Sequence, residues 1–244
     1  MQHAHRPLGL CLGLVTALAL GACSSSSEHA QSPAALETAR TDALARLDQA
    51  TDSLTQFRPG IADDVAARAR CVVVVPSLKK GGLVIGGQSG QGFATCRTAH
   101  GWSGPAPVQV GGGTFGAQIG FQSSDVVALV MSDKAMRTLE AGKLKAGVDA
   151  SAAAGPVGTG RGRQFGDAEI LSYSRSQGLF AGATLEGSSI DADTKATTAF
   201  YGPSATFESI LDGAVAPPAK TEVNRFLAAI REGFPPTPVA QSSR

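Results

Sequence analysis

Three clusters of basic residues are the part of this sequence best suited to binding chemistry. In chain order they are Lys79 with Lys80, Lys143 with Lys145, and Arg161 with Arg163. The last pair lies in the run GPVGTGRGR, whose glycines leave backbone groups exposed. Lysine and arginine side chains and free backbone amides are groups that bind phosphate oxygens. We interpret the clusters as candidate binding positions for an anionic head group. The alternative is that they are ordinary solvated charges on loops.

Two cysteines are candidates for a disulfide. Cys71 and Cys96 sit in the strand-like runs CVVVVP and GFATCR. They form an even pair in a chain that we expect to be exported to an oxidising compartment. A bond between them would close a loop of about 25 residues and stabilise the fold by roughly 3 kcal/mol in the chain-entropy model. The alternative is two buried free thiols.

Other kinds of chemistry find little support. After the N-terminal segment the only histidines are His29 and His100, and two cysteines lack further partners, so neither a catalytic triad nor a metal site is expected. Residues 111–116, GGGTFG, fit the spacing of a dinucleotide-binding loop, but an alternating strand pattern follows where that loop needs a helix. Asp63 and Asp64 are better explained as a solvated helix start than as a catalytic pair. We predict no enzyme and no cofactor.

The N-terminal segment has the pattern of a bacterial lipoprotein signal. Arg6 precedes an apolar run over residues 8–20, and Leu-Gly-Ala leads directly into Cys23. This predicts a signal peptide over 1–22, a lipid attached to Cys23 and a flexible tether over 23–33. An ordinary secretory signal is the alternative. By resemblance to other bacterial lipoproteins, Ser24 after the cysteine favours the outer membrane, facing the periplasm.

The overall charge argues against a nucleic-acid partner. The chain has 21 basic and 20 acidic residues, a formal charge of +1, and one of the basic residues is Arg6 in the predicted signal. A neutral mature chain does not attract nucleic acid through bulk charge. Binding to an anionic membrane would require a local cluster instead.

The apolar pattern predicts a helix at each end of the domain. Apolar residues three and four positions apart share one face of the first helix: Leu36, Ala39, Ala43, Leu47, Ala50, Leu54 and Phe57. Its other face is net acidic, which favours packing on the domain over lying on a membrane. A second amphipathic helix is expected after Pro217-Pro218.

Between these helices, runs of β-branched residues alternate with glycine-rich turns. The predicted fold class is therefore α+β: a β-rich domain of short, Gly-rich, mostly antiparallel strands flanked by N- and C-terminal helices. We expect a hairpin over 172–187, a turn over 76–80 and a helix capped by Ser132. A single domain is predicted over 34–234, followed by a disordered tail over 235–244.

Five segments match one family pattern in the family's order. They are VVVVPSLKKGGLVIGGQSGQG (72–92), GWSGPAPVQVGGGTFGAQIGFQSSDVVALVM (101–131), AAAGPVG (152–158), SYSRSQGLFAGATLEGSSI (172–190), and AFYG ahead of ILDG. Together they resemble the SYLF domain, also called the yeast-type actin-binding domain, over about residues 58–213. The resemblance implies a mixed α/β domain that binds phospholipid. Eukaryotic members bind phosphoinositides and some bundle actin, whereas bacterial members are commonly exported lipoproteins.

The sequence departs from the eukaryotic members in two places. Their lipid binding is attributed to an amphipathic helix before the domain and to basic residues, but the corresponding helix here is acidic. Thr197 stands where the family has an asparagine near the FYG motif. Neither phosphoinositides nor actin are expected as partners in a bacterial periplasm.

Two functions remain open. The first is a lipid-anchored envelope protein whose domain binds anionic phospholipid head groups through the basic clusters. The second is an envelope protein that binds a protein partner, with the acyl chains as its only membrane contact.

Overall fold

The computed structural model describes residues 32–82, 85–115, 120–155, 167–176, 179–182 and 185–235. Its helices are α1 (Pro33–Phe57), a 3-10 turn η1 (Arg58–Gly60), α2 (Asp63–Arg68), α3 (Asp133–Glu140), α4 (Thr194–Tyr201), α5 (Phe207–Leu211) and α6 (Thr221–Gly233). Its strands are β1 (Cys71–Gly82), β2 (Ile85–Thr98), β3 (Gly101–Trp102), β4 (Ala106–Phe115), β5 (Gly120–Val130), β6 (Lys143–Lys145), β7 (Ala152–Ala154), β8 (Ile170–Ser176), β9 (Leu179–Gly182) and β10 (Ser188–Ala192). All of these elements lie in one compact unit, Pro33–Arg244, which contains its own hydrophobic core and so has what it needs to fold alone.

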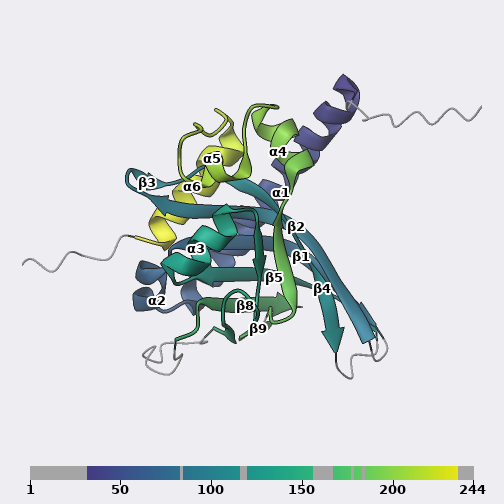
Figure 1. The fold of residues 1–244 in the computed structure, drawn as a ribbon, viewed down its shortest axis with the longest axis vertical. Helices are drawn as coiled ribbons and strands as arrows, with labels where there is room; N and C mark the ends of the chain where they lie inside the picture. Colours follow the sequence, from purple (N-terminus) through teal and green to yellow (C-terminus); the bar gives the residue numbers. More distant parts are fainter. Residues whose placement is uncertain are drawn as a thin grey trace, which may run out of the picture. The chain divides into compact units, whose positions relative to one another are not determined.

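The described strands form one ten-stranded sheet in the order β6-β10-β4-β2-β1-β5-β8-β7, with β3 beside β2 and β9 beside β8 (Figure 1). The β7–β8 pair is parallel and the other strand pairs are antiparallel. With helices before and after the sheet, the predicted α+β class is confirmed. The expected central hairpin is also present, as β8 and β9, while its corner at 177–178 lies outside the described residues.

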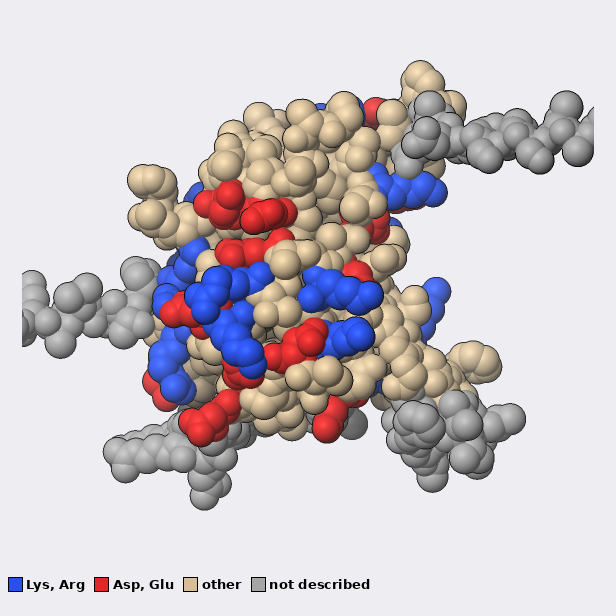
Figure 2. All heavy atoms as spheres, in the orientation of Figure 1, with Lys and Arg blue, Asp and Glu red and all other residues tan. Residues whose placement is uncertain are grey.

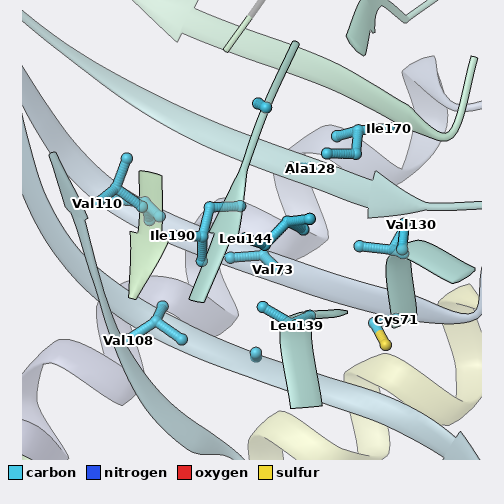
Figure 3. Close-up of a cluster of buried hydrophobic side chains, with 14 of the residues drawn as sticks. Cys71, Val73, Val108, Val110, Ala128, Val130, Leu139, Leu144, Ile170 and Ile190 are labelled. Carbon is cyan, nitrogen blue, oxygen red and sulfur yellow. The ribbon is translucent and has the colours of Figure 1, made fainter. Parts of the chain in front are cut away.

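Helices cover both faces of the sheet because side chains alternate between its two sides. Val72, Val74 and Phe93 face one side and pack with α1, α2 and α6, and we call this the α1 face. Val73, Ala94 and Val108 face the other side and pack with α3 and α5, and we call this the α3 face. Figure 3 shows the α3-face core, in which Leu139 of α3 and Leu144 of β6 lie among valines of the long strands and the isoleucines Ile170 of β8 and Ile190 of β10.

Helix α1 packs on the domain through the face that its periodicity indicates. Leu47, Leu54 and Phe57 are buried, and Arg225 of α6 forms ion pairs with Asp48 and Asp52 on α1. The first turns of the helix are exposed, with Leu36 and Ala39 only half-buried. The acidic side of α1 therefore serves partly to hold α6.

The prediction of a turn over 76–80 is wrong, because β1 continues through it to Gly82. A β-bulge makes this possible: the pairing register shifts between Val75 and Leu78, and Ser77 adopts a positive φ of 56°. The Ser77 amide donates a hydrogen bond to the Asp125 carboxylate at 3.0 Å. A bulge accepts Pro76, which has no N–H to give to a ladder, and lets the strand go on.

Because β1 continues, four long strands run past the core. Strands β1, β2, β4 and β5 have 12, 14, 10 and 11 residues, longer than the short strands expected. We call the strand segments that pack in the two cores the proximal end, and the segments 79–82, 85–89, 111–115 and 120–123 the distal sheet. Figure 1 shows the ends of β1, β2 and β4 projecting beyond the helices.

Candidate functional site

A row of mostly polar residues crosses the four strands of the distal sheet and continues through β10 to the edge strand β6. The ladders pair Lys145 with Ser189, Ser189 with Gly111, Gly111 with Ser89, Ser89 with Lys79, and Lys79 with Ser123. Residues directly paired across antiparallel strands project to the same side of the sheet. These six residues therefore share the α1 face, and we call them the basic row. Its two lysines are four strands apart, about 19 Å at the usual strand spacing.

The lysines of this face have no acidic partner. None of the ion pairs among the described residues involves Lys79, Lys143 or Lys145, although arginines elsewhere are commonly paired. Lys143 shares the face because it is two residues from Lys145, and it lies opposite Asp191 in the ladder. Asp191 accepts a hydrogen bond from the Ser189 hydroxyl at 2.7 Å, and its other carboxylate oxygen is buried without a described partner.

Lys80 does not join the basic row. It pairs with Gln88 and Gln122 and follows Leu78 by two positions, so it projects from the α3 face. It is half-buried there, and burial lowers its pKa. Of the four lysines that the sequence singles out, the structure thus brings three to one face and separates the fourth.

Three glycines leave the backbone beside the basic row uncovered by side chains. A Cβ built on Gly111 or Gly113 would meet nothing within 4 Å, and one on Gly87 would reach only the Gly112 carbonyl oxygen at 3.8 Å. None of the three has a positive φ. A glycine inside a strand destabilises the fold by about 0.5–1 kcal/mol relative to alanine. No described residue would clash with an alanine side chain at these three positions, so packing does not explain why they are glycines. Glycine at such a place permits the close approach of another molecule.

One end of the row opens into a hollow of about 340 Å³. It is lined by Gly111, Gly112, Lys145, Ala146, Val148, Gly187, Ser188 and Ser189. Ser188 lies at its buried side and accepts a hydrogen bond from the Gln88 side-chain amide, whose own carbonyl oxygen is buried without a described partner. The Lys145 ammonium group is the cation of this hollow, and an ammonium group can bind phosphate oxygens.

Charges of both signs mix on the face of the molecule that Figure 2 shows, without a broad patch of one sign. Basic character is therefore local, as expected from the net charge. Arg161, Arg163 and the lipid-attachment candidate Cys23 lie outside the described residues.

The remaining sequence-based expectations concern structure and other chemistry. Cys71 and Cys96 lie directly opposite each other on β1 and β2 and are joined by a disulfide. Residues 111–115 of the glycine-rich run are strand, so they form no phosphate loop at a helix N-terminus. Within the described ranges, no cluster of His, Cys, Asp or Glu could hold a metal ion. No helix among those ranges is long and apolar enough to cross a membrane.

Sequence reasoning missed the uncharged half of the basic row. Ser89, Ser123 and Ser189 belong to it, yet they lie up to a hundred positions apart in the chain. The available signal was the alternation within β2 and β5, which assigns faces but not which residues are neighbours across strands.

The family model described as "Ysc84: Las17-binding protein actin regulator" matches residues 111–232, half of the chain. Among curated proteins, LAS seventeen-binding protein 3 of Saccharomyces cerevisiae is 33% identical over 165 residues, covering 65% of this chain and 36% of the yeast protein. The SH3 domain-containing protein PJ696.02 of Schizosaccharomyces pombe is 36% identical over 169 residues, covering 66% of this chain and 39% of that protein. The mouse SH3 domain-containing YSC84-like protein 1 is 32% identical over 163 residues, covering 65% and 48%.

The chain thus spans between a third and a half of the length of these relatives. No solved structure matches it significantly. The matched region includes β4, β5, β10 and α4, and therefore half of the distal sheet. The chain belongs to the Ysc84 family, whose domain is the SYLF domain.

Proposed function

We propose that this protein is a lipid-anchored component of a bacterial envelope whose Ysc84-family domain binds the head groups of anionic phospholipids through the basic row. The observation that carries the proposal is that Lys79 and Lys145 lie in one row on an open sheet face with serines between them, and that neither ammonium group forms an ion pair among the described residues. Unpaired lysines near a bilayer surface contribute about 1 kcal/mol each with anionic lipid.

The uncovered backbone at these glycines supports head-group binding by the basic row. A head group can approach Gly111 and Gly113 closely because no side chain of the described residues stands there. The Ser89 and Ser123 hydroxyls, on either side of Lys79, can donate hydrogen bonds to phosphate oxygens, and the lysines supply the charge. The relatives' names point to a protein partner, Las17, for those proteins, and this keeps an envelope protein as the second candidate partner here.

The experiment is vesicle flotation with residues 33–244, so that no acyl chain on Cys23 can carry the binding. Vesicles are neutral phosphatidylcholine, with or without added phosphatidylglycerol. We expect binding only with the anionic lipid and weaker binding at high salt, because screening reduces attraction between exposed charges. Absence of flotation with both lipids would refute head-group binding by the domain and would favour the alternative, an envelope protein as the partner.

The matched variants test the site itself. Lys79→Gln with Lys145→Gln should weaken binding about 10- to 30-fold, from two lost contributions. The control is Lys80→Gln with Lys220→Gln, which removes the same charge from the α3 face and from the start of α6. Equal loss in both double variants would mean that net charge, and not the basic row, decides binding.

The anchor is a separate part of the proposal. We infer acylation at Cys23 and an outer-membrane location from the signal-like residues before it and from Ser24 after it. Mass measurement of the N-terminal peptide from membranes of expressing cells should show a lipid mass on Cys23. An unmodified cysteine in that peptide would refute acylation at Cys23, and it would have no bearing on head-group binding by the domain.

A further inference from the structure

Large apolar side chains are exposed in two places among the described residues, Phe121 at 99% and Val148 at 76%. Both border the basic row. Phe121 lies on β5 opposite Gly81, and Val148 lines the hollow at the other end. A single exposed apolar residue is common on proteins, but here their positions coincide with the unpaired lysines.

Each apolar side chain accompanies one lysine of the row. Phe121 projects from the same face as Ser123, two residues on, and Ser123 is the ladder partner of Lys79. Val148 lines the same hollow as Lys145. A lysine beside an exposed apolar group is the arrangement of proteins that sit at a bilayer surface, with the ammonium at phosphate depth and the apolar group among the upper acyl carbons.

Bare backbone separates the two positions. Phe121, Gly81, Gly87 and Gly113 are successive ladder partners. The phenylalanine ring lies over Gly81, and the uncovered glycines Gly87 and Gly113 continue the line across two more strands. Strand β5, which carries Phe121, and strand β6, which leads into Val148, are five strand spacings apart, about 24 Å at the usual spacing. A stable protein interface needs a contiguous buried patch of about 1,000 Å² or more. This face instead has two separate exposed apolar side chains, with polar residues and glycines between them.

We propose that the domain docks on anionic bilayers with its distal sheet leading, and that Phe121 and Val148 insert below the phosphates on either side of the basic row. The inference rests on the proposed head-group binding and extends it: the ligand is the bilayer itself, not a free phosphorylated head group. The lysines supply the attraction to anionic lipid, and the two apolar side chains supply a part of the binding that salt does not screen.

The test is depth-dependent quenching of a tryptophan placed at the anchor. Phe121→Trp in residues 33–244 is mixed with phosphatidylcholine–phosphatidylglycerol vesicles that carry bromines near the top of the acyl chains. The wild type supplies the background, because its single tryptophan, Trp102, packs against Phe234 and Arg97 beside α6. We expect quenching and a blue shift of the added tryptophan alone.

Affinity gives the second readout. Phe121→Ser should weaken flotation at high salt about tenfold or more, the effect of losing one large buried apolar side chain. Phe121→Leu should retain most of the binding, because it keeps an apolar group. Since Phe121 is exposed, neither variant should shift the denaturant midpoint of unfolding.

The outcomes separate the two proposals. Flotation that depends on Lys79 and Lys145 without any quenching of Phe121→Trp would overturn insertion and leave head-group binding intact. Quenching that survives Lys79→Gln with Lys145→Gln would support insertion and refute the role of the lysines. Inositol hexakisphosphate, a free polyphosphate, should compete only weakly, and full displacement by it would overturn the bilayer as ligand. A concentration-dependent dimer that Phe121→Ser abolishes, with no quenching, would assign the face to a second copy of the chain.

Discussion

The proximal end and the distal sheet use the same strands in opposite ways. At the proximal end charged residues are paired: Arg70 bonds Asp133 at 2.6 Å, and Arg225 bonds Asp48 at 3.1 Å. Arg97 donates hydrogen bonds to the carbonyl oxygens of Phe234 and Pro235 after α6. Side chains there fill both cores, and valines of β1 are almost fully buried.

In the distal sheet the same strands carry Lys79, Ser89 and Ser123, and no described residue lies within 4 Å of where a side chain on Gly111 or Gly113 would begin. The hydrogen-bonded pairing of the strands continues through this region. The difference indicates that the proximal end provides most of the stability of the fold, while the distal sheet provides the candidate binding surface. Such division is common, because binding surfaces are drawn from segments that contribute little to the core.

The strongest test of this comparison is one substitution made in both regions. A Cβ on Gly92 would lie 2.0 Å from the Val74 carbonyl oxygen, while Gly113 has open space. Gly92→Ala should lower the free energy of unfolding by about 3 kcal/mol or more, because the backbone has to move. Gly113→Ala should leave it unchanged or raise it by about 0.5 kcal/mol.

Urea unfolding followed by far-UV circular dichroism measures both variants. Similar losses at the two positions would show that the distal sheet is as tightly constrained as the proximal end.

A second test concerns the bond that joins two strands at the proximal end. Replacing Cys71 and Cys96 by alanine should cost about 3 kcal/mol of unfolding free energy, from the loop of 25 residues that the disulfide closes. Vesicle binding at a temperature where the variant remains folded should not change, since the basic row lies in the distal sheet. Loss of binding by a folded variant would show that the two ends are coupled.

The smallest expected effect is at Lys80, the one lysine of the distal sheet that faces the α3 side. Burial lowers its pKa in the folded state below the usual value of 10.5, so the unfolded chain binds more protons in the range between the two values. Wild-type stability should therefore rise with pH in the alkaline range just below 10.5. Lys80→Gln removes this cost and should raise stability near pH 7 by no more than about 0.5 kcal/mol.

Chemical unfolding of both proteins at pH 7 and pH 10 checks the sign. A wild type that loses stability relative to Lys80→Gln as pH rises would contradict the assigned burial cost.

Local patterns predicted the elements well and the site only in part. Spacing of apolar residues located α1, and a polar residue before an apolar run located the cap of α3, where Ser132 accepts a hydrogen bond from the Ala135 amide at 3.1 Å. Pro76 and Ser77 resemble a turn in sequence, and only the tertiary pairing of β1 with β2 and β5 shows that they form a bulge inside a strand.

The basic row itself depends on register between distant segments. Lys145 meets Ser189, and Lys79 meets Ser89 and Ser123, through ladders that no short stretch of sequence specifies. The basic residue types were therefore predictable, but their shared face was not.

The bulge at Ser77 has a consequence for how this family varies. Side chains in a strand alternate with period two, so each residue added or removed exchanges the two faces for everything that follows. With the bulge, Val75 and Leu78 both face the α3 side, and Lys79 is the lysine that reaches the basic row. If the same residues alternated plainly, without the bulge, Lys80 would face the basic row instead of Lys79. In comparing relatives, the presence or absence of this bulge, and not the position of a lysine in an alignment, decides which lysine the open face displays.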